Sequence, residues 1–181
     1  MQEKQICDWI AADPLRMRAL HIARALDLPD WCIAAGFVRN LVWDKLHGYA
    51  VPTPLDDIDL VYFDPAEATG ARDRCVEEAL AALDASLPWS VRNQARMHTR
   101  NDDPPYLSTA DAMRYWVEQE TAVGVRLEKD GALRVVAVFG LDSLLAGRIT
   151  PNRGRRKAHE FAVRLTKKDW LRKWPDLRVD A

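Results

Sequence analysis

The chain has 181 residues, 48% of them hydrophobic and 29% charged, a balance typical of a folded protein with a buried core. Its eight glycines and ten prolines are close to ordinary usage, which excludes collagen-like and low-complexity sequences. Charges interrupt every apolar stretch before the roughly 18 residues that a membrane helix needs. Because no signal-peptide pattern follows Met1, we expect a cytoplasmic protein without a membrane partner.

Residues 1–28 are predicted to form a helical lead. Ile6 and Ile10 recur at helical spacing, and Asp13 followed by Pro14 is typical of a helix N-cap and first turn. The apolar spacing indicates that these helices pack on a core.

A strand, a turn and a helix are expected next. The short apolar run 31–35 predicts a strand, Gly36 a turn, and the helical spacing beyond it a helix that ends at Gly48. The prolines of 49–55 predict an irregular loop. The segment 56–63 is rich in β-branched and aromatic residues, which favours a second strand.

The middle of the chain continues this mixture of elements. Asp64-Pro65-Ala66-Glu67 resembles a capping box that opens a helix reaching Leu83. Beyond it we expect a strand over 89–97, a short helix from Ser108 or Thr109 through Trp116, a hairpin of 122–127 with 133–138, and a helix over 141–145. Alternating strands and helices predict an α/β (α+β) fold with a mixed sheet packed by helices, in a single domain over 1–181.

The C-terminal segment 148–181 is predicted to be basic and mostly helical. Between Arg148 and Arg178 it has eleven Lys or Arg against three acids, a local net charge of +8, whereas the whole chain has a net charge of −1. Such a segment permits an anionic partner such as a nucleotide or nucleic acid, although a solvated helix face explains most basic segments. Cys7, Cys32 and Cys75 are isolated, so no zinc site or disulfide is expected, and the thiols are predicted to be buried.

The segment Asp57-Ile58-Asp59 suggests a metal site. Side chains alternate across a strand, so Asp57 and Asp59 project from one face while Ile58 and Leu60 point into the core. Paired carboxylates suit Mg²⁺, which protein sites hold with one or two carboxylates together with substrate phosphates. The alternative is a strand whose outer face has two solvated acids.

The segment Gly36-Phe37-Val38-Arg39-Asn40 suggests an anion site. A helix N-terminus presents free N–H groups, glycine allows phosphate oxygens to approach the backbone, and Arg39 could add a bidentate contact. The alternatives are an ordinary turn glycine and an exposed helical arginine.

These motifs together resemble a known family. The order strand, Gly-x-Val-Arg-Asn, helix and Asp-x-Asp is similar to the nucleotidyltransferase superfamily with the DNA polymerase β type of fold, and nearest to signatures of tRNA CCA-adding enzymes and bacterial poly(A) polymerases. The resemblance extends to a group of small uncharacterised bacterial nucleotidyltransferase-like proteins. It rests there on residues 36–40, 43–44, 57–59, 93–98, 125–127, 139–142, 147–153 and 168–170.

The chain departs from the superfamily pattern in two ways. Characterised enzymes usually have a second small residue after the glycine, where this chain has Phe37, which we expect to crowd the phosphate turn. They also have a third carboxylate on a neighbouring strand, where we expect Asn93, a residue that can ligate a metal but cannot take a proton at neutral pH. Glu118 or Glu120 could substitute for that carboxylate.

The resemblance implies a nucleotidyltransferase that uses Mg²⁺ or Mn²⁺. It would transfer a nucleoside monophosphate from a nucleoside triphosphate to an RNA end, a small molecule or a protein, releasing pyrophosphate. The implied roles are catalysis by Asp57, Asp59 and Asn93, metal binding by Asp57 and Asp59, phosphate binding by Gly36, Arg39 and Asn40, and possible substrate contacts by Arg96, Arg126, Asn152 and Arg153. The alternatives are a degenerate module that binds a nucleotide or an RNA end without turnover, and a partner-binding scaffold.

Overall fold

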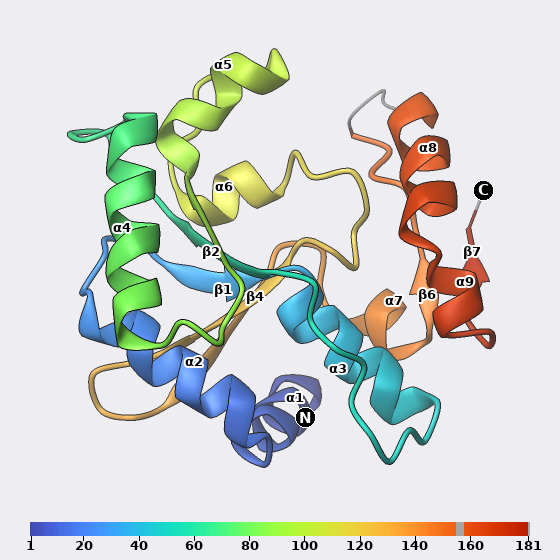
Figure 1. Cartoon of the computed structure of the whole chain (residues 1–181). Helices are drawn as coiled ribbons and strands as arrows, with labels where there is room; N and C mark the ends of the chain where they lie inside the picture. The colour runs from blue at the N-terminus through green and yellow to red at the C-terminus, as the bar shows by residue number, and fades with distance from the viewer. Residues whose placement is uncertain (155–157, 181) are drawn as a thin grey trace.

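Helices surround a mixed five-stranded sheet in the computed structural model, which describes residues 1–154 and 158–180 (Figure 1). The strand order is β3-β2-β1-β4-β5, with β2 and β3 parallel and the other neighbours antiparallel. The strands are β1 (Cys32–Ala34), β2 (Ile58–Tyr62), β3 (Trp89–Asn93), β4 (Val123–Leu127) and β5 (Leu133–Ala137). This architecture confirms the predicted mixed sheet packed by helices.

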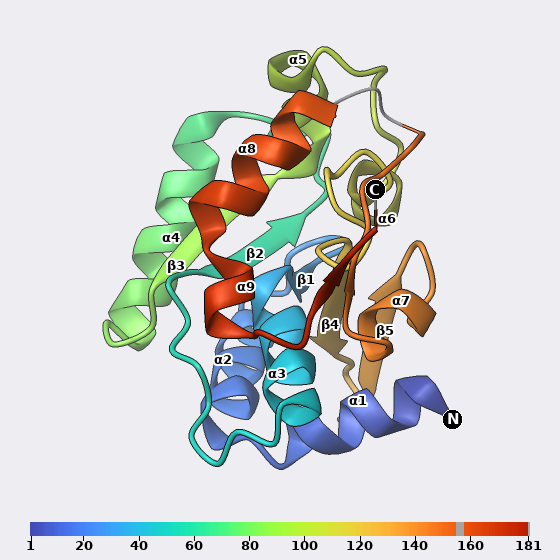
Figure 2. The same ribbon diagram turned by 90° about the vertical axis from the view of Figure 1, so that its right-hand side faces the viewer.

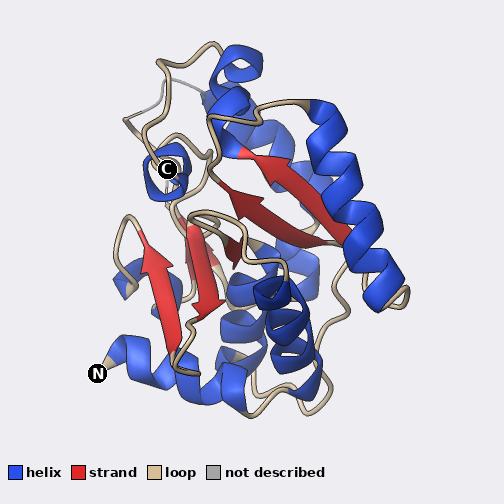
Figure 3. Cartoon of the chain, turned by 90° about the vertical axis from the view of Figure 1, so that its left-hand side faces the viewer, coloured by secondary structure: helices blue, strands red, loops and turns tan. Residues whose placement is uncertain are grey.

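The helices lie on both faces and at the edges of this sheet. They are α1 (Gln2–Ala11), α2 (Pro14–Ala25), α3 (Gly36–Leu46), α4 (Gly70–Leu83), α5 (Met97–Asn101), α6 (Thr109–Met113), α7 (Asp142–Leu145), α8 (Ala158–Lys168) and α9 (Trp170–Lys173). Helix α4 packs along β3, and α1 lies next to β5 (Figure 3). A small parallel pair, β6 (Arg148–Ile149) and β7 (Arg178–Val179), was not predicted. Positions 155–157 of the predicted basic segment lie outside the described residues.

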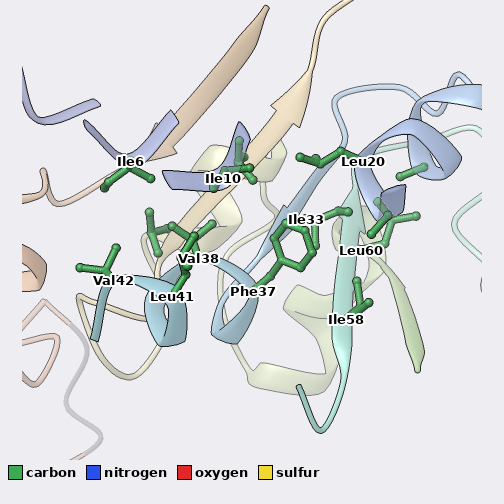
Figure 4. Packing of buried hydrophobic residues seen from close by; sticks show 14 of the residues in the cluster. Ile6, Ile10, Leu20, Ile33, Phe37, Val38, Leu41, Val42, Ile58 and Leu60 are labelled. Carbon is green, nitrogen blue, oxygen red and sulfur yellow. The ribbon is translucent and has the colours of Figure 1, made fainter. Parts of the chain in front are cut away.

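The sequence features that predict the N-terminal helices have the expected local roles. The Asp13 side chain accepts a hydrogen bond from the Arg16 backbone N–H at the start of α2, and Pro14 occupies its first turn. Ile6, Ile10 and Leu20 are fully buried in the larger core, where Figure 4 shows them with Ile33 and Phe37. Burying side chains of this size stabilises the fold by roughly 1.5–3 kcal/mol each.

Alternation along the strands decides which side chains reach each face of the sheet. Ile58 and Leu60 point into the larger core. Val61 packs on the opposite face, with Cys32 and Ala34 of β1. Asp59 therefore projects on the same face as Val61, away from the larger core.

The helix expected from Asp64 begins later, at Gly70. Thr69 is its N-cap and accepts a hydrogen bond from the Arg72 backbone N–H. Asp64 instead accepts from the Ala66 N–H, and its backbone N–H and carbonyl are both bound by the Asn93 side chain. These contacts hold an irregular turn where the local pattern favours a helix.

The predicted strand 89–97 is also shorter than expected. Strand β3 ends at Asn93, where the side-chain carbonyl accepts a hydrogen bond from the Ala95 N–H and starts a 3-10 helix over Gln94–Arg96. The chain then continues directly into α5. The capping contact of Asn93 therefore turns the backbone away from the sheet.

The hairpin of β4 and β5 confirms the prediction, with Gly131 at φ +86° in its turn. Of the three thiols only Cys32 is buried, which raises its pKa to about 12, whereas Cys7 is half-buried and Cys75 exposed. Burial of all three was therefore a wrong prediction. None of the described helices is both long and apolar enough to cross a membrane.

Candidate active site

A cavity of about 620 Å³ lies between β2, the first turn of α3 and the C-terminal helices α8 and α9. Figure 2 shows α8 and α9 on the side of the molecule where β2 and α3 meet. The lining of this main cavity includes six residues singled out in the sequence, namely Gly36, Arg39, Asn40, Asp57, Asp59 and Glu118. Segments far apart in the chain thus converge as the predicted metal and anion sites require.

The two aspartates lie at the start of β2. Asp59 is the second residue of the strand and Asp57 immediately precedes it. Burial raises the pKa of Asp59, and the charge of Asp57 raises it further. A hydrogen bond from Ser90 lowers this pKa, as do the positive charges of Lys168 and Arg39. A carboxylate whose charge is destabilised by burial and by a neighbouring carboxylate is suited to share a bound cation with that neighbour.

Ser90, rather than Asn93, lies next to this pair. In the parallel register of β2 and β3, Asp59 pairs with Ser90 while Asn93 pairs with Tyr62, at the other end of the strand. Asn93 is 0% exposed and its amide binds the backbone of Asp64 and Ala95. Its expected place beside the aspartates is therefore corrected: the side chain points to the core face, as does that of Val91.

The glycine turn begins α3 at the edge of the cavity. Because β1 is antiparallel to β2 and Ala34 pairs with Asp59, the chain after Ala34 runs back toward Asp57. Ala35, the residue before Gly36, is the N-cap and has φ +56°, a conformation that favours glycine. A Cβ on Gly36 would lie 3.3 Å from the Asn40 side-chain nitrogen, so the helix start is closely covered by Asn40.

Phe37 does not crowd this turn, contrary to the prediction. Its side chain is 0% exposed in the larger core, and the Arg16 guanidinium lies 5.6 Å from its ring centroid. The Phe37 carbonyl accepts a 2.7 Å hydrogen bond from Arg16 Nε. The small residue beside Gly36 is Ala35, on its N-terminal side.

Arg39 is held inside the protein at the cavity wall. Its guanidinium carbon lies 5.0 Å from the Trp43 ring centroid and 4.6 Å from that of Trp170, a cation–π sandwich. Nη1 donates to Thr121 Oγ1 at 2.6 Å and Nη2 to Asn40 Oδ1 at 3.0 Å. Burial lowers the pKa of Arg39 to about 10, so it remains charged at neutral pH. These contacts hold the guanidinium in place and use two of its five N–H groups, whereas the buried Nε has no hydrogen-bond partner among the described residues.

Glu118 and Glu120 have different environments. Glu118 is 1% exposed, lines the cavity, and accepts from Arg164 of α8 in a fork of 2.6 and 3.1 Å. Glu120 does not line the cavity, and its Oε2 accepts from the Thr150 N–H. Glu118 is thus the carboxylate that reaches the site, but its charge is already paired with Arg164.

The buried side chain of Asp44 in α3 binds the C-terminal end of α9. Asp44 accepts hydrogen bonds from Trp174 Nε1 at 2.8 Å and from the backbone and hydroxyl of Thr53. Trp174 packs edge-on against Trp43, 5.1 Å between centroids. These contacts fix α9 and the 49–55 loop at one end of the cavity.

The four expected substrate contacts lie outside the lining of this cavity. Arg96 pairs with Asp73, and Arg126 donates to Glu128 at 2.7 Å. Asn152 is buried and its amide donates to the carbonyls of Arg114 and Trp116. Arg153 is exposed on the turn that follows. The geometry therefore brings none of the four to the cavity.

Several lining residues were missed by sequence reasoning. They are Arg92 in β3 and Gln94 directly after it, Trp116 before β4, and Arg164 and Lys168 on α8; Gln94 and Lys168 lie in segments that carry the family resemblance, but no role at the site was expected for them. Strand alternation could have found Arg92, because Val91 belongs to the core face and its neighbours must face the other way. The α8 residues have no such local signal, since their position depends on how the C-terminal segment docks.

The main cavity also has an apolar region. Val61 lies two residues beyond Asp59 on β2, roughly 6–7 Å along the strand. Met97, Trp116, Val117 and Val163 join it in lining the cavity. The cavity thus combines a charged region at Gly36 and the aspartates with an apolar region beyond them.

No cluster of three or more His, Cys, Asp or Glu side chains that could hold a metal occurs among residues 1–154 and 158–180. The acidic pair of Asp57 and Asp59 nevertheless supplies the oxygen ligands that Mg²⁺ and Mn²⁺ accept. Such a pair binds these ions best when substrate phosphates complete the coordination.

Comparisons with known proteins agree with this geometry. A family model described as "Nucleotidyltransferase" matches residues 21–179. A solved protein whose NMR structure "reveals a CCA-adding enzyme head domain" is 30% identical, with a TM-score of 0.86 over 98% of this chain and 95% of that chain. No curated protein matches the sequence.

More distant matches show the same fold within larger enzymes. A CCA-adding enzyme solved with CTP is 13% identical, with a TM-score of 0.62 over 98% of this chain and 43% of that chain. A tRNA nucleotidyltransferase complexed with a primer tRNA and an incoming ATP analogue is 17% identical, with a TM-score of 0.58 over 90% and 46%. The chain spans less than half of either enzyme. The family match and the 30% identical structure show that the chain belongs to the nucleotidyltransferase family of transferases.

Proposed function

We propose that the protein is a metal-dependent nucleotidyltransferase that moves a nucleoside monophosphate from a nucleoside triphosphate to an acceptor and releases pyrophosphate. The observation that supports this most directly is the shared cavity of Asp57, Asp59 and the Gly36 end of α3. Two carboxylates repel the negative charge of a triphosphate, whereas a cation between the carboxylates and the phosphates would attract both groups.

The residues at the site fit a divalent cation. Asp59 is partly buried beside Asp57, and both features raise its pKa, so Ser90, Lys168 and Arg39 compensate its ionised form only in part. Asp57 and Asp59 would hold Mg²⁺ or Mn²⁺. Such ions, when bound, offset negative charge on the phosphates and lower the pKa of a hydroxyl that they contact.

The charged and apolar regions of the cavity suggest how a nucleotide lies. We place the phosphate tail toward Gly36, whose helix start offers N–H groups, and the nucleoside toward Val61 and Trp116. A flat indole is a suitable surface for stacking or edge contact with a base. The sandwiched Arg39 contributes fixed positive charge behind the phosphates rather than a mobile contact.

The reaction joins an acceptor oxygen to the α-phosphorus. The bond between that phosphorus and the pyrophosphate oxygen breaks, pyrophosphate leaves, and the acceptor proton passes to water. Ser90, beside Asp59, cannot take this proton at neutral pH, and Glu118 is paired with Arg164. The contribution of the chain is therefore positioning and electrostatics.

The acceptor belongs to one of three classes, an RNA end, a small-molecule hydroxyl or phosphate, or a protein side chain. The primer tRNA in one related complex supports the RNA end.

The test is a transfer assay with the four α-labelled nucleoside triphosphates, each with Mg²⁺ or Mn²⁺ and with RNA, small-molecule or protein acceptors. We expect metal-dependent release of pyrophosphate and a labelled acceptor, reduced by two or more orders of magnitude in Asp59→Asn. Asp8→Asn, on the exposed face of α1, is the matched control. Metal-dependent binding without turnover would support the degenerate binding module instead, and absence of both would reject the proposal.

A further inference from the structure

Lys168 is the last residue of α8 and lines the main cavity. Asp57 and Asp59 line the same cavity, so the ammonium and the acidic pair face a common space. Lys168 lies one helical turn after Arg164, whose fork with Glu118 fixes this face of α8 against the cavity. The lysine is thus held near the aspartates by a buried ion pair that it does not itself join.

The other cations of the cavity already have partners. Arg39 is sandwiched between two indoles, Arg164 is bound by Glu118, and Lys173 lies 3.6 Å from Asp56. Arg92 lies 3.7 Å from Glu77. Within residues 1–154 and 158–180, the Lys168 ammonium makes no hydrogen bond or ion pair.

A phosphate tail in this cavity needs such a charge. Asp57 and Asp59 offset much of the charge of any cation bound to them, so a triphosphate that joins them keeps excess negative charge. A lysine ammonium is a compact point charge on a flexible stem, suited to phosphate oxygens whose exact position changes during the reaction.

We propose that Lys168 binds the phosphate tail of the nucleoside triphosphate, opposite the Gly36 end of α3, and so makes the site prefer triphosphates over monophosphates. This inference rests on the proposed function. It adds Lys168 to the phosphate-binding residues Gly36, Arg39 and Asn40 that the family resemblance implies, and gives the basic C-terminal segment a specific contact with the nucleotide. Arg164 acts as a positioning residue that sets the place of Lys168.

The chain offers a matched control at the next position. Lys167 is an exposed lysine of the same helical turn, but it does not line the cavity. Lys168→Ala and Lys167→Ala therefore remove the same charge from the same helix, and differ only in which side of α8 loses it.

The experiment measures dissociation constants of a nucleoside triphosphate, diphosphate and monophosphate by calorimetry, at one fixed Mg²⁺ concentration. In Lys168→Ala we expect triphosphate affinity to fall by about tenfold or more, the loss of one charge-assisted contact, and monophosphate affinity to change by less than about twofold. Lys167→Ala should match the wild type. Lys168→Arg should keep most of the triphosphate affinity, since its charge remains.

Two outcomes would overturn the assignment. In one, Lys168→Ala binds the triphosphate as tightly as the wild type, which leaves the proposed function intact but removes Lys168 from the site. In the other, affinity falls by the same factor for all three nucleotides, so that Lys168 compensates the charge of Asp59 and does not bind the phosphate tail. If the wild type binds no nucleotide with metal, both the proposed function and this assignment fail.

Discussion

Ser90 lies directly beside Asp59 on the neighbouring parallel strand, and its hydroxyl hydrogen-bonds the carboxylate. That position on β3 is where a further acid would share the site with Asp57 and Asp59. Serine can orient a carboxylate but has no proton-accepting charge at neutral pH. Strands β2 and β3 therefore bring no third carboxylate next to Asp57 and Asp59 at this position.

Asn93 is predicted to stabilise the fold without contributing to nucleotide binding. Asn93→Ala removes the bonds that its fully buried amide makes with Asp64 and Ala95, which should cost about 2 kcal/mol or more. Thermal unfolding should move down by roughly 4–8 °C for a chain of this size. The dissociation constant for Mg²⁺-nucleotide, measured well below the transition, should stay unchanged. A tenfold higher dissociation constant in a folded Asn93→Ala variant would contradict this prediction and show that Asn93 contributes to nucleotide binding.

Arg39 should not tolerate lysine. A lysine cannot lie flat between Trp43 and Trp170 while donating to both Thr121 and Asn40. We expect Arg39→Lys to lower the free energy of unfolding by about 1–3 kcal/mol in urea titrations. Arg172→Lys, at an exposed position of α9, is the control. Equal stability of the two variants would contradict the structural role of the sandwich.

Gly124 marks a close approach of β1 and β4. A Cβ at this position would lie 2.7 Å from Cys32 Sγ and 3.4 Å from the Ala34 Cβ. Gly124→Ala should therefore destabilise the protein by about 1–3 kcal/mol, seen as an earlier urea midpoint. Gly124→Ala combined with Cys32→Ala should recover part of the loss. No recovery in the double variant would place the strain elsewhere.

Asp59 is expected to cost stability at neutral pH when no divalent cation is present. Its folded-state pKa is raised by burial and by Asp57, so its favourable contribution exists below the unfolded pKa of about 3.9 and is lost as pH rises through the folded pKa. In EDTA at pH 7, Asp59→Asn should melt higher than the wild type, by roughly 2–4 °C per kcal/mol. The difference should vanish near pH 3.

One result of this melting experiment would contradict the expectation. Asp59→Asn melting below the wild type at pH 7 in EDTA would show that the carboxylate is stabilised by the protein itself. Added Mg²⁺ with nucleotide should raise the melting temperature of the wild type and leave the variant almost unchanged.

Local sequence patterns predicted two parts of the site. They are the acidic pair, which follows from the alternation of side chains along β2, and the glycine at the start of α3. Ile58 and Leu60 are apolar, so Asp57 and Asp59 had to face away from the core, and Gly36 had to open a helix next to them. The same parity argument, applied to Val91, would have excluded Asn93. The end of the strand does not affect this argument, because Val91 and Asn93 lie on one face whether the strand ends at Asn93 or at Met97.

Long-range docking determined the rest. The contact between Arg164 and Glu118 joins segments 46 residues apart, and that between Trp174 and Asp44 segments 130 apart. No local pattern indicates either pair. The helix expected at Asp64 was wrong for a similar reason, because Asn93, 29 residues away, holds that backbone in a turn.

The most direct measurement of the central claim is calorimetric titration of the protein with a nucleoside triphosphate, with Mn²⁺ and in EDTA. Wild-type protein should bind the nucleotide tightly only when the divalent ion is present, and Asp57→Asn/Asp59→Asn should lose that dependence together with most of the affinity. Equal nucleotide affinity of the wild type and the double variant, in Mn²⁺ and in EDTA alike, would contradict a cation shared between these aspartates and the phosphates.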